Sequence, residues 1–188
     1  MTTPSATDPH PDRTAKEVDT QVASAAARGN TRSDSLYALI EQQPFFKGLN
    51  PHHLQLLTDS ALEMQFEPGD SILQEGSPAN RFYLILEGKV VLEAELEDRV
   101  MIPVQTLGPG DDLGWSWLFP PYSLHSTARA LEPTKTIFFY GTRLREQCEQ
   151  DHDLGYHLMN RVAEVVIERL RATQQRLSEC VAARSSDR

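Results

Sequence analysis

The chain has few cysteines and no long apolar run. Among its 188 residues, only Cys148 and Cys180 are cysteines, which are too few and too far apart for a disulfide framework or a zinc knuckle. No apolar run approaches the roughly 20 residues that span a membrane, and the N-terminus lacks the basic and apolar segments of a secretory signal. These absences predict a cytoplasmic protein that has no membrane partner.

Positive charge is scarce as well. The chain has 18 lysines and arginines against 27 acidic residues, which gives a net charge of -9. Proteins draw most of their affinity for nucleic acid from basic side chains that neutralise phosphates, and this chain has no basic run or arginine-rich helix. The composition therefore argues against a nucleic-acid partner.

A recognisable catalytic or metal site is missing too. His52 and His53 fall within an expected helix, and His152 and His157 have a spacing that suits no helical pair of metal ligands. We interpret these histidines as surface or packing residues. No nucleophile and base stand in a readable pattern. The sequence thus predicts no catalytic residue, no metal and no enzymatic activity.

The N-terminal region, residues 1–33, is polar and rich in Thr, Ser, Asp and Ala, without a sustained apolar period. This composition predicts a disordered tail. Residues 22–28, VASAAAR, have a second interpretation as a short helix that forms on a partner.

Two short helices are expected next. Residues 35–42 place three apolar side chains on one helical face, and Pro44 ends that helix. Asn50 followed by Pro51 predicts the N-cap and first residue of a second helix. The buried stripe of this second helix is Leu54, Leu57 and Ala61.

From Leu62 onward the apolar period changes from that of a helix to two residues. Short apolar-alternating segments follow one another, separated by glycine-containing turns. Such strands at near-regular spacing indicate a barrel or a sandwich, so residues 34–150 are predicted to form a mainly β domain with flanking helices. The expected strands are 62–66, 82–86, 90–96, 100–104, 126–131 and 136–140.

The chain then returns to helix, with a short segment at 142–150, a long one at 151–183 and a tail at 184–188. Gly155, near the start of the long helix, predicts a close packing contact. The long helix could pack on its own barrel through Val162 and Val165. It also carries a heptad seam that predicts a homodimer, and the two arrangements can hold together on opposite faces. The seam residues are Met159, Ala163, Val166, Leu170, Thr173, Leu177 and Cys180.

An ordered series of motifs runs between Phe66 and Ala130: F-x-P-G-D-x-I, F-x-L-I-x-E-G-x-V, L-G-P-G-D, L-G and S-T-A-R-A. From about Phe45 to Leu177 the chain resembles the cyclic nucleotide-binding domain of the catabolite activator protein superfamily. The resemblance implies a double-stranded β-helix, also called a β-roll or jelly roll. Short N-terminal helices and a long C-terminal dimerisation helix would flank it.

The resemblance also locates a ligand cassette. In the family, a glutamate binds the ribose hydroxyl, and an arginine nine residues later pairs with the cyclic phosphate. Aligned on Leu113-Gly114 and on Thr127–Ala130, this chain has Trp115 at the glutamate position and Leu124 at the arginine position. Removing one partner of a buried charge pair costs roughly 3–5 kcal/mol, or two to three orders of magnitude in affinity. Cyclic AMP and cyclic GMP are therefore disfavoured ligands.

The cassette leaves three interpretations of its aromatic residues. They could stack on a ligand or line an apolar pocket, fill the space of a nucleotide, or face a protein partner. Strand alternation turns Arg129 away from the pocket. Thr173 is either a ligand contact from the closing helix, as in the family, or a seam residue. The candidate ligand residues are Gly114, Trp115, Ser116, Trp117, Leu124, His125, Ser126 and Thr173.

These observations lead to one functional prediction and one alternative. Residues 181–188 are too short for the helix-turn-helix domain that follows the long helix in transcription factors of this superfamily. We expect a stand-alone, homodimeric regulatory domain, with a small-molecule ligand or none, that acts on a protein partner. The alternative is a ligand-independent interaction module with a filled pocket, which docks to a larger assembly through its disordered tail.

Overall fold

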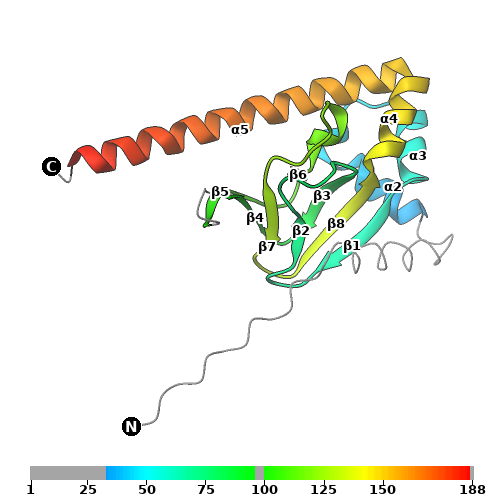
Figure 1. The fold of residues 1–188 in the computed structure, drawn as a ribbon. Helices are drawn as coiled ribbons and strands as arrows, with labels where there is room; N and C mark the ends of the chain where they lie inside the picture. The colour runs from blue at the N-terminus through cyan, green and yellow to red at the C-terminus, as the bar shows by residue number, and fades with distance from the viewer. Residues whose placement is uncertain (1–32, 96–99, 187–188) are drawn as a thin grey trace, which may run out of the picture.

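The structure of the protein is a computed structural model that describes residues 33–95 and 100–186. Two antiparallel sheets form a roll, short helices gather at one end of it, and one long helix lies across it and runs on beyond it (Figure 1). Within the described residues, no helix combines the length and the apolar character needed to cross a bilayer. The predicted tail up to residue 32, including residues 22–28, lies outside the described residues.

The first helices form where the sequence signals them. Helix α2 covers Ser33–Glu41, a 3-10 helix η1 covers Pro44–Phe46, and helix α3 covers Pro51–Thr58. The predicted cap is present, because the Asn50 Oδ1 accepts a hydrogen bond of 2.8 Å from the backbone N–H of His53. The extension of α3 to Ala61 was wrong. After Thr58 the chain continues in tight turns, which bring Ala61 to the core outside the helix.

Within residues 33–95 and 100–186, eight strands form two four-stranded sheets, which confirms the mainly β prediction. The first sheet has the order β1-β8-β3-β6, with β1 at Leu62–Phe66, β8 at Thr134–Tyr140, β3 at Arg81–Glu87 and β6 at Asp112–Leu113. The second has the order β2-β7-β4-β5, with β2 at Ser71–Leu73, β7 at Thr127–Ala130, β4 at Val90–Glu95 and β5 at Met101–Leu107. The sequence missed β2 and β6, because two or three residues are too few to show an alternation.

Strand β3 is buried on both faces and divides the core in two. Tyr83 and Ile85 point into the roll, between the two sheets. Phe82 and Leu84 point to the other side, where the helices cover the first sheet. The fold therefore packs the helices against a strand whose central residues, 82–85, are buried on both faces.

Two helices close the domain. Helix α4 covers Gly141–Gln150 and α5 covers His152–Ser186. Helix α5 continues past the predicted end at residue 183 because no glycine or proline follows Gly155 in the sequence. One face of α5 is buried through Leu154, Leu158 and Val162. The close contact expected at Gly155 is confirmed, since a Cβ there would lie 3.0 Å from the Cys148 carbonyl oxygen.

Candidate functional site

The cassette begins at a turn that only glycine can make. Gly114 has a φ of +82°, and a Cβ built on it would lie 2.4 Å from the Arg81 carbonyl oxygen. A left-handed conformation and this close approach both exclude a larger residue. The turn ends β6 and starts the 3-10 helix η2, Trp115–Leu118.

Beyond this turn lies a cavity of about 180 Å³, here called the cassette cavity. Its walls come from the cassette, from β2, β4 and β5 of the second sheet, and from α5. Seven of the eight residues expected to bind a ligand line it, and Trp117 is the exception. The lining residues are Leu73, Leu92, Val104, Gln105, Gly114, Trp115, Ser116, Leu124, His125, Ser126, Arg169 and Thr173.

Trp115 and Leu124, the residues at the two family charge positions, both face this cavity. Leu124 is buried, and backbone hydrogen bonds of 2.9 Å to Ser77 and Gly76 fix its position. Trp115 is half-buried, and its ring lies 5.8 Å from the ring of the exposed His125. This part of the wall is therefore apolar and aromatic where the family would place a glutamate and an arginine.

Trp117 belongs to the core, and its expected place in the ligand pocket was wrong. Its side chain is fully buried on the helical side of the first sheet, where its ring lies 6.1 Å from that of Phe82. Trp115 lines the cavity and only borders this cluster, because residues two apart in the tight η2 turn project to different sides. Trp117 thus anchors the cassette instead of lining or filling it.

Arg129 does not supply the missing positive charge. Its Nε lies 3.3 Å from the Glu93 carboxylate, and its Nη1 donates a hydrogen bond of 2.9 Å to the Gly69 carbonyl oxygen. It is absent from the lining of the cassette cavity. The alternation of β7 predicted this orientation correctly.

The positive charge in the cassette cavity comes from Arg169 of α5, which sequence reasoning missed. The signal was present, because Val162 and Val165 mark the inward face of the long helix and Arg169 follows on that face by one helical turn. Thr173 lies one turn further and lines the same cavity, while its hydroxyl donates to the Arg169 carbonyl oxygen at 2.9 Å.

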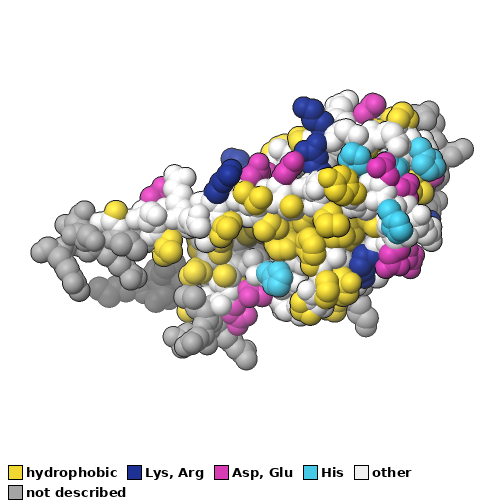
Figure 2. Space-filling model, turned by 90° about the horizontal axis from the view of Figure 1, so that it is seen from above, with side chains coloured by type: hydrophobic (Ala, Val, Ile, Leu, Met, Phe, Trp, Pro, Cys, Tyr) yellow, Lys and Arg dark blue, Asp and Glu magenta, His cyan; other side chains and the backbone are white. Residues whose placement is uncertain are grey.

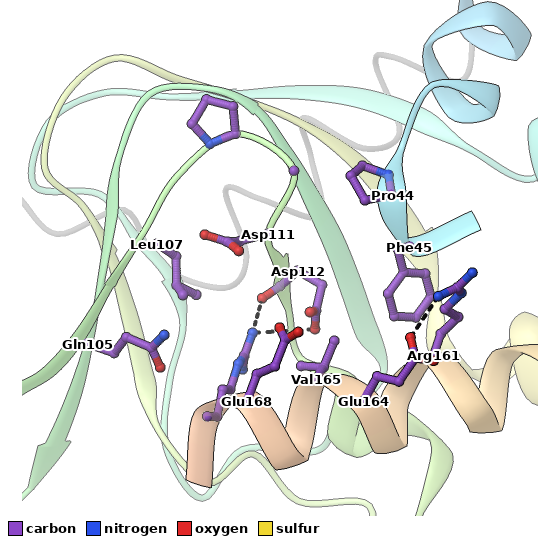
Figure 3. Close-up of a pocket in the computed structure, with 13 residues that line it drawn as sticks. Pro44, Phe45, Gln105, Leu107, Asp111, Asp112, Arg161, Glu164, Val165 and Glu168 are labelled. Carbon is purple, nitrogen blue, oxygen red and sulfur yellow. Dashed lines mark hydrogen bonds and ion pairs between the residues drawn. The ribbon is translucent and has the colours of Figure 1, made fainter. Parts of the chain in front are cut away.

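Arg169 also reaches a second cavity, of about 370 Å³, here called the helix-side cavity (Figure 3). Gln105 and Arg169 line both cavities. The second one lies between η1, the β5–β6 turn and α5, and acidic side chains of the turn and of α5 point toward it. Its lining residues are Pro44, Phe45, Gln105, Leu107, Pro109, Gly110, Asp111, Asp112, Arg161, Glu164, Val165, Glu168 and Arg169.

In this second cavity, Arg169 contacts Asp112 of β6 twice. Its Nη2 donates a hydrogen bond to the Asp112 carbonyl oxygen and lies 3.4 Å from the carboxylate Oδ2. Burial raises the pKa of Asp112 to about 6, against the opposing effect of the Arg169 charge. Asp112 is therefore a buried carboxyl group that is half protonated at about pH 6, even with the Arg169 guanidinium beside it.

A second pair ties α5 to the N-terminal helices. The Nε2 of buried His53 lies 3.0 Å from the Oδ2 of Asp151, and the Oδ1 of Asp151 accepts backbone hydrogen bonds at the start of α5. The backbone N–H of Leu154 and then the nearby His53 lower the pKa of Asp151. His53 is thus a packing residue, one of the two roles expected for it.

Much of the predicted seam lies on the outer face of α5, whereas Thr173 lines the cassette cavity and Val166 packs against the core. Met159, Leu170 and Leu177 are 49%, 55% and 65% exposed, and Tyr156, one heptad before Ala163, is 62% exposed. Ala163 and Thr173 are exposed and Val166 is half-buried, while the side chain of Cys180 lies outside the described residues. Seen from the α5 side, hydrophobic side chains gather along the middle of this face (Figure 2).

Across residues 33–95 and 100–186, no three His, Cys, Asp or Glu side chains come close enough together to hold a metal ion.

Comparisons with known proteins fit this geometry. The family model "Cyclic nucleotide-binding domain" matches residues 63–151. A solved structure from Geobacter metallireducens, of a protein assigned to the cyclic nucleotide-binding proteins, is 33% identical with a TM-score of 0.63. That likeness covers 73% of this chain and 97% of the other.

Two curated relatives are regulators. The CRP-like cAMP-activated global transcriptional regulator of Mycobacterium tuberculosis is 24% identical over 143 residues, which are 76% of this chain and 62% of that protein. The cAMP-dependent protein kinase type I-alpha regulatory subunit of Mesocricetus auratus is 40% identical over 62 residues, 32% of this chain and 37% of the subunit. The chain thus spans less than two thirds of either relative.

Proposed function

The chain belongs to the cyclic nucleotide-binding domain family, and we propose that it is a non-enzymatic regulatory domain whose ligand differs from the family's cyclic nucleotides. The lining of the cassette cavity carries this proposal. Trp115 and Leu124 remove the family's two charged contacts, while Arg169 and Thr173 add a wall from α5. An occupant would touch the roll and the closing helix together, so it would favour one position of α5.

Two properties of the cavity argue against cyclic AMP and cyclic GMP. A phosphate placed at Leu124 would be buried against a hydrocarbon side chain without a counter-charge there, which is costly. The cavity of about 180 Å³ is also smaller than the roughly 300–1,000 Å³ typical of small-molecule sites. Both properties favour a smaller ligand with a partly apolar body.

The outer face of α5 supports a homodimer. Its exposed seam has the spacing of a coiled coil, and the inner face of the same helix is already buried on its own domain. A movement of α5 would therefore change the surface that the dimer presents to a protein partner. The low cysteine content suits a reducing compartment, so we place this regulatory step in the cytoplasm.

The nucleotide part of the proposal is tested with Trp115 as the reporter. Because Trp117 is a core residue, its fluorescence must be removed first, and Trp117→Phe leaves one tryptophan in the cavity wall. We expect no change of emission on titration with cyclic AMP or cyclic GMP into the millimolar range, and no heat of binding. Micromolar binding of either nucleotide would contradict the proposal.

The helix part is tested by hydrogen exchange along α5. A small molecule that raises the melting temperature should also change amide protection from about residue 162 to residue 177. If no compound in a metabolite panel alters α5, and partner capture is lost when residues 1–33 are deleted, the ligand-independent module with a docking tail is the better description.

A further inference from the structure

Arg169 lies between the two cavities and lines both of them. Among the described residues that line the cassette cavity, it is the only lysine or arginine. Much of the remaining wall is apolar, formed by Leu73, Leu92, Val104 and Leu124 with the ring of Trp115. A cation set in such a wall matches a small anion that has an apolar body.

The contact that holds Arg169 on the other side is incomplete. The Asp112 Oδ2 lies 3.4 Å from the guanidinium, yet it accepts no hydrogen bond from any described residue, although the carboxylate is buried. The carboxylate oxygen and the guanidinium are thus held by charge and not by a hydrogen bond. Exchange of Arg169 to another anion would give up its hydrogen bond to the Asp112 carbonyl oxygen, and the buried carboxylate would then need a proton in place of the lost charge.

The surroundings of Asp112 are otherwise acidic. Asp111 in the same turn and Glu168 on α5 both disfavour its charge, and Glu164 lies in the same cavity wall. Arg161, the other cation of this cavity, is 2.7 Å from Glu164 and donates a hydrogen bond to the Lys47 carbonyl oxygen. The segments η1 and β5 contribute only uncharged residues to this wall. Without Arg169, Asp112 would face mainly like charges.

Building on the proposed function, we propose that Arg169 is an exchangeable anion receptor. In the structure it neutralises Asp112, and a small anionic ligand in the cassette cavity draws it away, whereupon Asp112 takes up one proton from solvent. Because Arg169 lies on α5, the exchange changes a contact that holds the closing helix to β6. Ligand charge, proton uptake and helix position are thereby linked.

The volume of the cavity limits the ligand class. An apolar protein cavity of about 150 Å³ accommodates benzene, and the cassette cavity has about 180 Å³. A ring-sized carboxylate or sulfonate fits this space, with its ring against Trp115 and Leu124 and its charge at Arg169. Benzoate and benzenesulfonate are therefore suitable probes, and benzamide is a neutral counterpart of similar shape.

Proton uptake has a measurable sign. With Arg169 in place, the pKa of Asp112 is about 6, so the carboxylate is mostly ionised at neutral pH. Losing the Arg169 charge raises that pKa further, since Arg169 is the cause that lowers it most. Proton uptake then accompanies ligand binding, and affinity for a permanently ionised probe should rise as the pH falls toward about 6, by at most about tenfold per pH unit.

The test is calorimetric titration of the full chain with benzoate, benzenesulfonate and benzamide at several pH values. We expect the two anions, and not benzamide, to bind with the pH dependence just described. Asp112→Asn should bind the anions at least as tightly at about pH 8 and should lose the pH dependence. The matched control Asp111→Asn removes the adjacent, exposed carboxylate and should keep the pH dependence, moved to slightly lower pH because the Asp111 charge helps to raise the pKa of Asp112.

Three outcomes would overturn the exchange. They are equal binding of benzamide, an unchanged pH slope in Asp112→Asn, and no binding of either anion at millimolar concentration. Arg169→Gln should abolish binding of both anions, and its fold is checked by circular dichroism.

The two proposals fail separately. Proton-linked anion binding without any change in α5 hydrogen exchange would leave the exchange standing and remove the regulatory function. A neutral ligand that moves α5, without proton-linked binding of anions, would support the regulatory function and contradict the exchange.

Discussion

Gly141, the first residue of α4, packs directly against Trp117 of η2: a Cβ built on the glycine would lie 2.7 Å from the Trp117 Cβ. The Trp117 carbonyl oxygen also accepts a hydrogen bond of 2.6 Å from Arg145 Nη1, on the same helix. The cassette is therefore fixed to α4 by its buried tryptophan, while its other tryptophan remains at the cavity. Within the 3-10 helix η2, Trp117 therefore packs in the core and Trp115 lines the cassette cavity.

The first prediction concerns this contact. Gly141→Ala should destabilise the protein by roughly 1–3 kcal/mol, because the new methyl group overpacks a filled core. Gly108→Ala is the matched control, since a Cβ at Gly108 meets no atom within 4 Å. Urea unfolding of the two variants should show a lower midpoint for Gly141→Ala alone. Equal midpoints would mean that α4 can move away from Trp117 at little cost.

The fold could be predicted from sequence largely because its signals are local. The Asn50-Pro51 cap and the alternation from Leu62 onward each depend on neighbours within a few residues, so they can be recognised without knowledge of the tertiary structure. The short strand β6 carries no such signal. It forms only because β3 pairs with it, with Tyr83 opposite Leu113.

The candidate site was predictable in part, for the same reason. Residues of the cassette follow one another in the chain, so a single alignment located seven cavity-lining residues once Thr173 is included. Arg169 lies more than fifty residues away from Asp112, and the pair depends on how α5 crosses the roll. Trp117 was misplaced because a sequence pattern does not say to which side a turn residue points.

The second prediction concerns the seam. Leu170→Lys should convert the proposed dimer into a monomer, because a lysine at a coiled-coil core position loses apolar contact and repels its counterpart. The residue is 55% exposed in one chain, so the domain itself should remain folded. Gln175→Lys adds the same charge on the opposite face, beside Glu179, and should leave the dimer intact. Sedimentation velocity distinguishes monomer from dimer, and a Leu170→Lys dimer would contradict the seam.

The third prediction follows from the pKa of Asp112, which burial raises from 3.8 to about 6. The folded state then binds a proton more tightly than the unfolded state. The contribution of Asp112 to the free energy of unfolding is fully present below about pH 4 and is lost as the pH rises through about 6. The loss amounts to roughly 3 kcal/mol.

The measurement is urea unfolding across this pH range at one fixed protein concentration, which holds any dimer contribution constant. Subtracting the curve of Asp112→Asn from that of the wild type should reveal a decline over the stated window. Asp111→Asn, which removes the exposed neighbouring carboxylate, should keep the decline but move it to slightly lower pH, because the Asp111 charge helps to raise the pKa of Asp112. If Asp112→Asn also keeps that slope, Asp112 titrates at an ordinary value.

The last prediction restores the family's two charged contacts. Trp115 and Leu124 both face the cassette cavity, as the alignment to the family requires. The double variant Trp115→Glu, Leu124→Arg should therefore gain affinity for cyclic AMP by two to three orders of magnitude over the wild type, because a buried charge partner is worth roughly 3–5 kcal/mol. Replacing Trp115 by the smaller glutamate also enlarges the cavity for the nucleotide. The control Trp115→Glu, Ser123→Arg has the same charges, but Ser123 is not among the residues that line the cassette cavity, so its arginine should not confer binding. Calorimetry with cyclic AMP gives both affinities. A folded Trp115→Glu, Leu124→Arg variant that gains no affinity would show that these two positions do not correspond to the family's ligand contacts.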